Sequence, residues 1–262
     1  MDLGFKGKTA MVAAAGRGLG FGVARVLAFE GARVSIASRR SQSITRAAQT
    51  ISSETGAQVR GYVFDASDGA SIERWTGDTV ARFGTVDCLL VNAGGPPAGN
   101  FDDFDDQHWE SAFRLTLLSS VRLIRAVLPH MRAQKKGSIL VVTSTAVREP
   151  IENLLLSNVM RAGVAGLVKT LSRELAPDNI RINNLVPGRF DTDRVRELDD
   201  EISAKKGISP QEQKSSMQQL IPLGRYGTTE EFGNAAAFLL SDSAGYVTGE
   251  SFFIDGGLTK GI

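Results

Sequence analysis

The sequence predicts an α/β fold of the doubly wound type, with one mostly parallel, seven-stranded sheet covered by helices on both faces. Three observations predict it. Short apolar runs alternate with longer amphipathic stretches along the whole chain. A glycine-rich segment, residues 16–20, separates the first apolar run from the first amphipathic stretch. Strands that alternate with helices need right-handed crossovers, which make neighbouring strands parallel. The 262 residues contain no linker or repeat, so we expect a single domain spanning residues 1–262.

The predicted elements follow one another in a regular order. The first strand, residues 9–15, is a short apolar run, and the helix after the glycines ends at Gly31, a residue typical of helix C-terminal caps. Pro129 lies near the end of a long helix at 105–134, which it is expected to kink or end. The other predicted strands are 32–38, 58–64, 86–91, 138–143, 181–186 and 251–254, and the other helices are 41–54, 69–83, 153–175 and 229–240.

Residues 191–220 interrupt this alternation. The segment is long and rich in charge, and it follows the carboxyl end of a predicted strand, where open α/β sheets bind their ligands. It is either a solvated excursion or a lid over a substrate site. The lid is favoured because long segments at this position are usually functional.

Composition and charge exclude several functional classes. With 30 Lys and Arg against 29 Asp and Glu, the net charge of +1 predicts no nucleic-acid or membrane-surface partner. Cys88 is the only cysteine, so no internal disulfide is possible and a cytoplasmic location is expected; its apolar surroundings indicate a core residue. The first apolar run is too short for a signal sequence or a membrane span. No cluster has metal-ligand spacing, so no metal is expected.

The glycine-rich segment predicts a dinucleotide site. Backbone N–H groups at the start of the following helix can receive a pyrophosphate. An acidic residue at the end of the second strand would bind a ribose 2′-hydroxyl, but that position holds Ser38, followed by Arg39 and Arg40, with Arg17 in the glycine loop nearby. Guanidinium groups suit a 2′-phosphate, so NADP(H) is predicted in preference to NAD(H). The alternative is that Arg39 and Arg40 are ordinary solvated residues.

Several segments resemble the short-chain dehydrogenase/reductase family. Ala13-Ala14-Ala15-Gly16-Arg17-Gly18-Leu19-Gly20 is similar to the family's TGxxxGxG loop, with alanines in place of its leading Thr-Gly. Whether the methyl group of Ala14 is tolerated depends on the backbone conformation there. The resemblance runs from about Gly7 to Gly257 and implies a Rossmann fold, with the 3-oxoacyl-(acyl-carrier-protein) reductase branch as the nearest pattern. The cofactor contacts that it implies are Ala14, Gly16, Arg17, Gly18, Leu19, Gly20, Ser38, Arg39, Arg40, Asp65, Ala66, Asn92, Ala93, Gly94, Arg161, Pro187, Gly188 and Thr192.

The family's catalytic Asn, Ser, Tyr and Lys are largely replaced. The resemblance places the Ser at Ser144, the Tyr at Ser157 and the Lys at Arg161. The Asn position is Thr116. An alkyl hydroxyl is a far weaker acid than a phenol, and an arginine does not release its proton, so Ser157 and Arg161 cannot reproduce the family's proton donor. They stand four residues apart on a predicted helix and so share one face, either as a coupled replacement, which we favour, or as an ordinary exposed pair.

No other side chain is an obvious replacement for the missing phenol. Tyr62 and Tyr246 are interpreted as structural, and Tyr226, which follows the expected lid, is a minor candidate for the proton donor. His108 and His130 are interpreted as surface or packing residues.

Two functions remain open. The favoured one is an NADP(H)-dependent oxidoreductase that interconverts a small-molecule carbonyl and an alcohol, using a non-standard proton donor. The alternative is a catalytically silent dinucleotide-binding protein, acting as a sensor or an assembly partner. Small residues along the helix at 153–175 permit close helix packing, and the resemblance implies that this helix pairs with a second copy. We therefore expect a homotetramer or homodimer.

Overall fold

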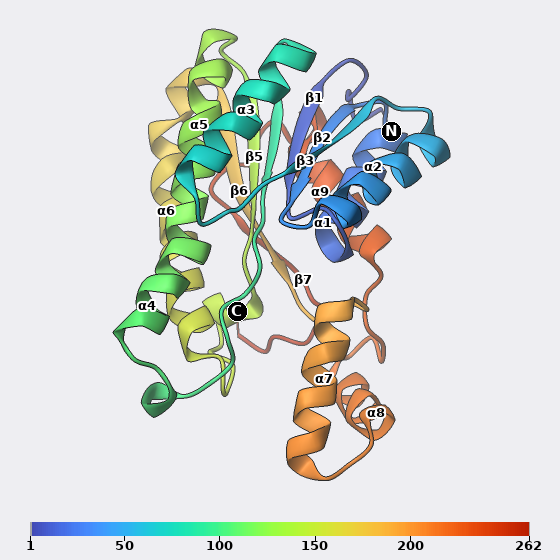
Figure 1. The fold of residues 1–262 in the computed structure, drawn as a ribbon, viewed down its shortest axis with the longest axis vertical. Helices are drawn as coiled ribbons and strands as arrows, with labels where there is room; N and C mark the ends of the chain where they lie inside the picture. The colour runs from blue at the N-terminus through green and yellow to red at the C-terminus, as the bar shows by residue number, and fades with distance from the viewer. Residues whose placement is uncertain (1, 262) are drawn as a thin grey trace.

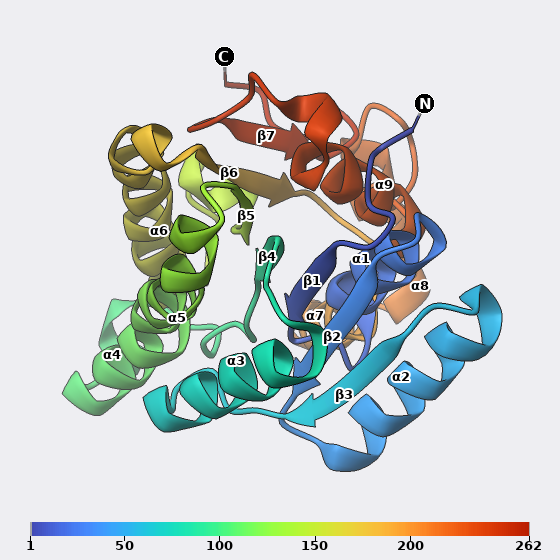
Figure 2. The same cartoon turned by 90° about the horizontal axis from the view of Figure 1, so that it is seen from above.

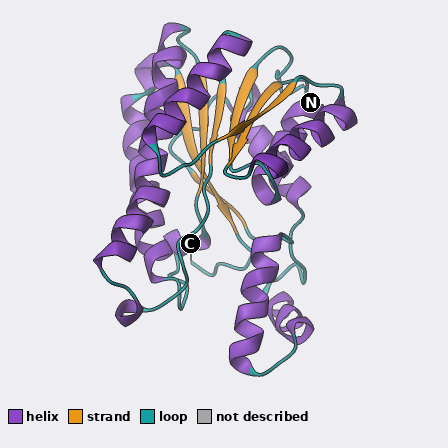
Figure 3. Cartoon of the chain, viewed as in Figure 1, coloured by secondary structure: helices purple, strands orange, loops and turns teal. Residues whose placement is uncertain are grey.

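Seven parallel strands form the centre of the structure (Figure 1, Figure 3). The computed structural model describes residues 2–261. The strand order across the sheet is β3-β2-β1-β4-β5-β6-β7, and every pair of neighbours is parallel. The predicted fold class is therefore confirmed. The strands are β1 (Thr9–Ala13), β2 (Arg33–Ser38), β3 (Val59–Val63), β4 (Cys88–Val91), β5 (Gly137–Val142), β6 (Ile180–Pro187) and β7 (Ser251–Ile254).

Helices cover both faces of this sheet (Figure 2). One layer contains α1 (Gly18–Phe29), α2 (Ser41–Thr55) and α9 (Thr229–Leu240), and the other contains α3 (Gly69–Phe83), α4 (Asp106–Ala112), α5 (Ser119–Ala133) and α6 (Leu155–Glu174). Successive side chains of a strand point to opposite faces. Ala10 and Val12 of β1 accordingly join the core beneath α1 and α9, whereas Met11 and Ala13 join the core beneath α3, α5 and α6.

The sheet reverses its strand order between β1 and β4. From β1 the chain builds outward to β3, then returns to add β4 on the other side of β1. The loops that leave β1 and β4 therefore diverge at the carboxyl edge of the sheet. Open α/β sheets bind ligands in the crevice at such a reversal.

The predicted long helix at 105–134 is interrupted by a π-helical segment. The structure has α4, then a π-helical segment at Phe113–Leu118, then α5. Pro129 lies inside α5, which continues to Ala133, so Pro129 does not end the helix. A π-helical turn adds one residue and redirects the side chains around it, and such turns are frequent at functional sites. Thr116 lies within this segment.

Residues 191–220 are folded rather than irregular. Their two helices, α7 (Asp193–Lys206) and α8 (Pro210–Leu220), project beyond the carboxyl edge of the sheet (Figure 1). Asp199 of α7 is buried; its carboxylate lies 3.0 Å from Arg189 Nη1 and accepts a 2.8 Å hydrogen bond from Tyr226 Oη. The sequence reading assigned no helix here, because the segment has few apolar residues to define a helical period.

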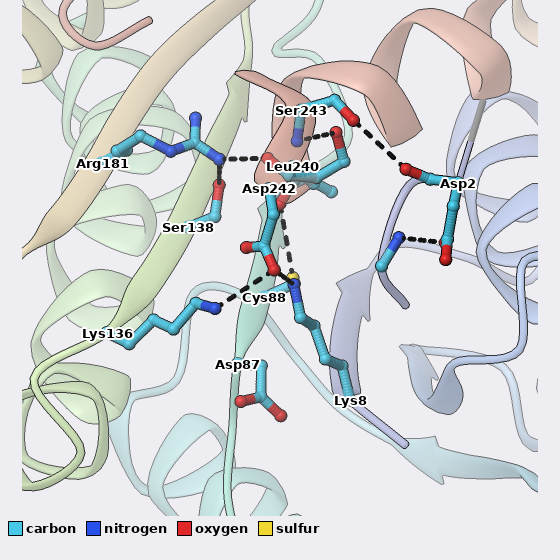
Figure 4. A network of polar contacts seen from close by, with 12 residues as sticks. Asp2, Lys8, Asp87, Cys88, Lys136, Ser138, Arg181, Leu240, Asp242 and Ser243 are labelled. Carbon is cyan, nitrogen blue, oxygen red and sulfur yellow. Dashed lines mark hydrogen bonds and ion pairs between the residues drawn. The ribbon is translucent and has the colours of Figure 1, made fainter. Parts of the chain in front are cut away.

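A polar network closes the opposite, amino-terminal edge of the sheet (Figure 4). The Asp242 carboxylate forms ion pairs with Lys8 Nζ at 2.8 Å and Lys136 Nζ at 3.1 Å. Arg181 Nη2 donates a hydrogen bond to Ser138 Oγ at 3.0 Å. Cys88 is 1% exposed beside this network, and burial raises the pKa of its thiol to about 12. Its interpretation as a core residue is confirmed. No helix within residues 2–261 has the length and apolar character to span a bilayer.

Candidate active site

A niche lined by hydroxyl groups lies between the glycine loop and the end of β2. A Cβ atom added to Gly16 would lie 2.8 Å from Ser38 Oγ and 2.9 Å from Ser43 Oγ, so a side chain at this position would displace one or both hydroxyls. Ser38 Oγ is buried and has no hydrogen-bond partner within residues 2–261. Ser43, in the first turn of α2, is a site residue that the sequence reading missed; its position two residues after the start of the predicted helix was the available signal.

The start of α2 adds positive character to this niche. Arg39 and Arg40 are exposed, and neither forms an ion pair with the residues that the structure describes. Arg40 is the N-cap of α2 and caps no backbone N–H with its side chain. Uncapped N–H groups and the helix dipole both favour an anion. The residues present therefore fit the phosphorylated ribose of an NADP-type dinucleotide.

Ala14 adopts a left-handed backbone conformation, with φ of 53°. Non-glycine residues are strained there because Cβ crowds the backbone. This answers the question left open by the sequence: Ala14 occupies a position that favours glycine, and the fold holds it there.

Arg17 of the glycine loop contacts α7. Its guanidinium lies 3.1 Å from Asp193 and 3.5 Å from Glu197. Hydrogen bonds from Arg196 and then from Arg17 lower the pKa of Asp193. From the sequence we expected Arg17 to lie with Arg39 and Arg40 at the 2′-phosphate site. In the structure it forms ion pairs with α7.

Asp65 lies just after β3, and one of its carboxylate oxygens accepts hydrogen bonds. Its Oδ1 accepts the backbone N–H of Ser67 at 2.9 Å and the Ser67 hydroxyl at 2.7 Å, and these bonds lower its pKa. Its Oδ2 makes no hydrogen bond within residues 2–261 and is available to an amine. Ala66 beside it is buried.

The loop after β6 faces the glycine loop across the crevice. Pro187 ends β6, and the N–H of Gly188 bonds to the carbonyl of Ile254 at 2.9 Å. Thr192 is buried and caps α7, and its Cγ2 would lie 3.7 Å from a Cβ added to Gly18. The structure thus brings together two predicted cofactor segments that are over 170 residues apart in sequence.

Ser157 and Arg161 form one hydrogen-bonded unit. Arg161 Nε donates to Ser157 Oγ at 3.1 Å, and Nη1 donates to the carbonyls of Val142 at 3.2 Å and Thr143 at 3.0 Å. Ser157 is 9% exposed and Arg161 is half-buried, so they are not an ordinary exposed pair on a helix. Burial lowers the pKa of Arg161 to about 10.

Ser144 lies just after β5, next to the backbone carbonyls that accept hydrogen bonds from Arg161. Its Oγ accepts the N–H of Ala146 at 3.3 Å, as the cap of a 3₁₀ turn at Thr145–Val147. Within residues 2–261, neither Ser144 nor Ser157 donates its hydroxyl proton to a protein acceptor. Both O–H groups are therefore available to a ligand.

Thr116 lies near Arg161 in a small pocket. The pocket is lined by Val91, Asn92, Ala93, Gly94, Thr116, Ser120, Val142, Arg161 and Val164. Thr116 is 5% exposed, and its Oγ1 has no partner within the described residues. The pocket thus brings together residues of β4, the loop after it, the π-helical segment, α5, β5 and α6.

The loop after Gly94 is fixed against the start of α6. Gly99 forms a β-bridge with Leu154, and its N–H bonds to the carbonyl of Asn153 at 2.7 Å. The side-chain amide of Asn158 donates to the carbonyl of Ile151 at 2.9 Å. Asn158 is a positioning residue that the sequence reading missed, and nothing in the sequence alone marks it.

The three tyrosines lie away from Arg161 or are engaged elsewhere. Tyr226 donates to Asp199, and burial together with that carboxylate raises its pKa, which makes it a poor proton donor. Tyr62 is half-buried on β3. Tyr246 is fully exposed, so its interpretation as a structural residue is wrong; no core packing surrounds it.

Within residues 2–261, no group of three or more His, Cys, Asp or Glu residues could hold a metal ion.

Comparisons with known proteins agree with the fold. Residues 13–259 match the family model described as "Enoyl-(Acyl carrier protein) reductase". The chain is 34% identical to the 3-oxoacyl-(acyl-carrier-protein) reductase of Escherichia coli K12, over 98% of this chain and 99% of that protein. It is 33% identical to human dehydrogenase/reductase SDR family member 4, over 95% and 87%. The crystal structure of Gluconobacter frateurii L-sorbose reductase, complexed with NADPH and L-sorbose, superposes with a TM-score of 0.95 at 28% identity, over 100% of both chains.

Proposed function

The chain belongs to the short-chain dehydrogenase/reductase family of oxidoreductases, and on that premise we propose that it interconverts a carbonyl and an alcohol with NADP(H). The observation that carries the proposal is that two hydroxyl donors and a half-buried cation lie at the same edge of the sheet as the glycine loop. Ser144, Ser157 and Arg161 supply those groups.

NADP(H) is proposed over NAD(H) because the niche at the end of β2 has no carboxylate to accept a 2′-hydroxyl. It has instead Ser43, the Ser38 hydroxyl, and the exposed arginines Arg39 and Arg40; among residues 2–261, Ser38 Oγ has no hydrogen-bond partner and neither arginine has an ion pair. L-sorbose reductase, which has the same fold, was crystallised with NADPH. In this chain Asp65 and Thr192 would complete the contacts to the adenine and the nicotinamide ends.

Each side chain has a role that its geometry supports. NADPH, when bound, supplies the hydride. Ser144 accepts a backbone N–H and so presents its proton to the substrate carbonyl oxygen. Arg161, held by two backbone carbonyls, keeps a positive charge beside that oxygen, and a preorganised charge in a buried site stabilises a developing alkoxide. The final proton comes from water, because a serine hydroxyl is too weak an acid to deliver it.

One observation favours the second candidate, a catalytically silent dinucleotide-binding protein. Within residues 2–261 the Ser157 hydroxyl has a hydrogen bond with Arg161 and none with a phenol, imidazole or carboxylic acid, and Tyr226 is bound to Asp199. We still favour the enzyme, since positioning and electrostatics alone supply much of an enzyme's rate.

The decisive experiment combines binding with turnover. We expect NADPH to bind more tightly than NADH in a fluorescence titration, and the wild type to oxidise NADPH with at least one member of a carbonyl panel that includes 3-oxoacyl thioesters and L-sorbose. The double variant Ser157→Tyr with Arg161→Lys restores the family's own pair. Loss of the native activity in it supports a distinct chemistry for Ser157 and Arg161. Activity that appears only in the double variant supports the silent protein.

The proposal also covers the oligomeric state and the cellular location of the protein. We propose a homotetramer or homodimer built on α6, which carries the exposed small residues Ala162 and Gly163. A monomeric mass by light scattering at micromolar concentration would contradict it. The single cysteine suits a reducing compartment, and we propose the cytoplasm.

A further inference from the structure

Asn184 of β6 is a buried amide that binds the residue next to Ser144. It is 0% exposed, and its Oδ1 accepts a 2.7 Å hydrogen bond from the hydroxyl of Thr143, which is 3% exposed. Its Nδ2 donates to Ser251 Oγ of β7 at 3.1 Å. Only a carboxamide of this length makes both bonds, because one end accepts and the other donates. Asn184 therefore links the residue that follows β5 to β7, across the strand between them.

Thr143 is held at three separate points. Its backbone N–H donates to the carbonyl of Leu185 at 3.2 Å, and its own carbonyl accepts a bond from Arg161 Nη1 at 3.0 Å. Its side chain is held by Asn184 alone among the residues that the structure describes. If that bond were removed, the Thr143 hydroxyl would be a buried polar group without a partner, which is costly and favours a rearrangement of this residue.

The Thr143 carbonyl belongs to the same peptide unit as the N–H of Ser144. A peptide unit is planar, so a rotation that moves the carbonyl also moves the backbone of the next residue. Ser144 is the N-cap of the 3₁₀ turn at Thr145–Val147, and its backbone is extended, with φ of −164° and ψ of 157°. A shift of Thr143 would therefore reach Arg161 through the carbonyl and Ser144 through the chain.

Asn183, the preceding residue of β6, offers a comparison. Side chains alternate along a strand, so Asn184 points to the face covered by α6 and Asn183 to the face covered by α9. Asn183 is 1% exposed, and its amide donates to the carbonyl of Val247 at 2.9 Å and accepts the N–H of Glu250 at 3.1 Å. The two asparagines thus match in burial and in hydrogen bonding, and they differ in that Asn184 binds Thr143.

We propose that Asn184 is a positioning residue for the active site, and that it sets the places of Arg161 and Ser144 through Thr143. The inference rests on the proposed function, in which those two side chains bind the carbonyl oxygen of the substrate. Asn184 itself is fully buried and acts through its neighbour. Because a misplacement of about 1 Å can lower a rate about 100-fold, a small shift of Thr143 should have a large effect on kcat.

Steady-state kinetics with the best carbonyl substrate of the panel test this role. Asn184→Leu should lower kcat about tenfold or more and change the KM for NADPH less than about twofold, since the glycine loop is not altered. Asn183→Leu is the matched control: it also removes a buried amide and should keep the wild-type kcat. Thr143→Val should behave like Asn184→Leu, and Thr143→Ser, which keeps the hydroxyl, should restore most of the activity. Equal losses of kcat in Asn183→Leu and Asn184→Leu would overturn the proposal.

Hydrogen exchange tests the same inference without turnover. The backbone N–H groups of Ala146, Val147 and Arg148 bond within the turn that Ser144 begins. In a peptide that spans residues 145–149, mass spectrometry should show exchange about fivefold faster in Asn184→Leu than in the wild type, the equivalent of one lost hydrogen bond. Asn183→Leu should exchange there like the wild type.

Unchanged exchange in both Asn184→Leu and Thr143→Val would overturn the proposal. Circular dichroism verifies that each variant is folded, and Thr143→Val, which keeps the size of the side chain, decides the matter if Asn184→Leu does not fold. A protein that turns over no carbonyl would contradict the proposed reaction, whereas the exchange of residues 145–149 would still decide the role of Asn184. The two proposals therefore fail separately.

Discussion

Replacing Ala14 with glycine is expected to stabilise the protein. Ala14 has a φ of 53°, in the left-handed region, where an alanine Cβ crowds the backbone at a cost of about 1–2 kcal/mol. Glycine removes that cost but adds about 0.5–1 kcal/mol of unfolded-state entropy. Ala14 is half-buried, so the loss of its methyl contacts subtracts little more. The net gain is about 0.5–1 kcal/mol in the free energy of unfolding.

Urea denaturation followed by circular dichroism measures this gain as a shift in the midpoint at unchanged slope. In thermal unfolding the gain corresponds to a rise of roughly 1–4 °C for a chain of this size. Ala13→Gly is the matched control: Ala13 lies one residue earlier in β1, is 0% exposed, and does not have a positive φ. That variant should be destabilised by about 1 kcal/mol or more, through lost packing and added entropy.

Opposite signs for the two glycines are the essential prediction. A destabilised Ala14→Gly variant, or equal losses in both, would refute the reasoning that backbone strain at this position outweighs chain entropy. A gain in stability would also show that the fold, and not the local preference of alanine, holds the glycine loop in shape.

Three further predictions concern other parts of the molecule. Arg189→Met leaves the buried Asp199 without its cation and should lower the free energy of unfolding by about 3 kcal/mol or more. The control is Arg196→Met, which removes an exposed ion pair and should lower it by less than about 1 kcal/mol, both measured by urea unfolding. Equal losses in the two variants would contradict the burial argument. Because burial raises the pKa of Cys88 from 9.0 to about 12, the stability that the neutral thiol contributes is fully present below pH 9 and is lost as the pH rises toward 12. The difference in unfolding free energy between the wild type and Cys88→Ala should therefore fall between about pH 8 and about pH 10.5, and a constant difference would argue against a buried thiol. Arg39→Ala should weaken NADPH binding about tenfold and leave NADH binding unchanged, as measured by fluorescence titration; equal effects on both would remove Arg39 from the 2′-phosphate site.

The pairing of Ser157 with Arg161 bears on the changed catalytic set that we propose. The two side chains hydrogen-bond to each other, and Arg161 also ties α6 to the end of β5 beside Ser144. A single reversion at either position would leave a new side chain without its partner. The pair is therefore best studied as a unit, as in the double variant proposed above.

The sequence by itself determined the fold class and the strand-to-helix turn at residues 16–20, where we propose that the cofactor binds. Alternating apolar runs and amphipathic stretches define the strands and helices, and residues 16–20 lie where a strand turns into a helix. These signals are local: they depend on side-chain period and on turn-forming residues within a few positions of one another. For that reason the seven strands were predicted close to their observed bounds.

The tertiary structure alone decided what the unusual residues contact. No sequence pattern predicts three of these features. They are the left-handed conformation of Ala14, the π-helical turn around Thr116 and the pairing of Arg17 with α7. Each arises from a balance between local strain and contacts made by distant segments. The hydrogen bonds of Arg161 to Ser157 and to the end of β5 are of the same kind, because only the folded chain shows which groups surround a half-buried charge.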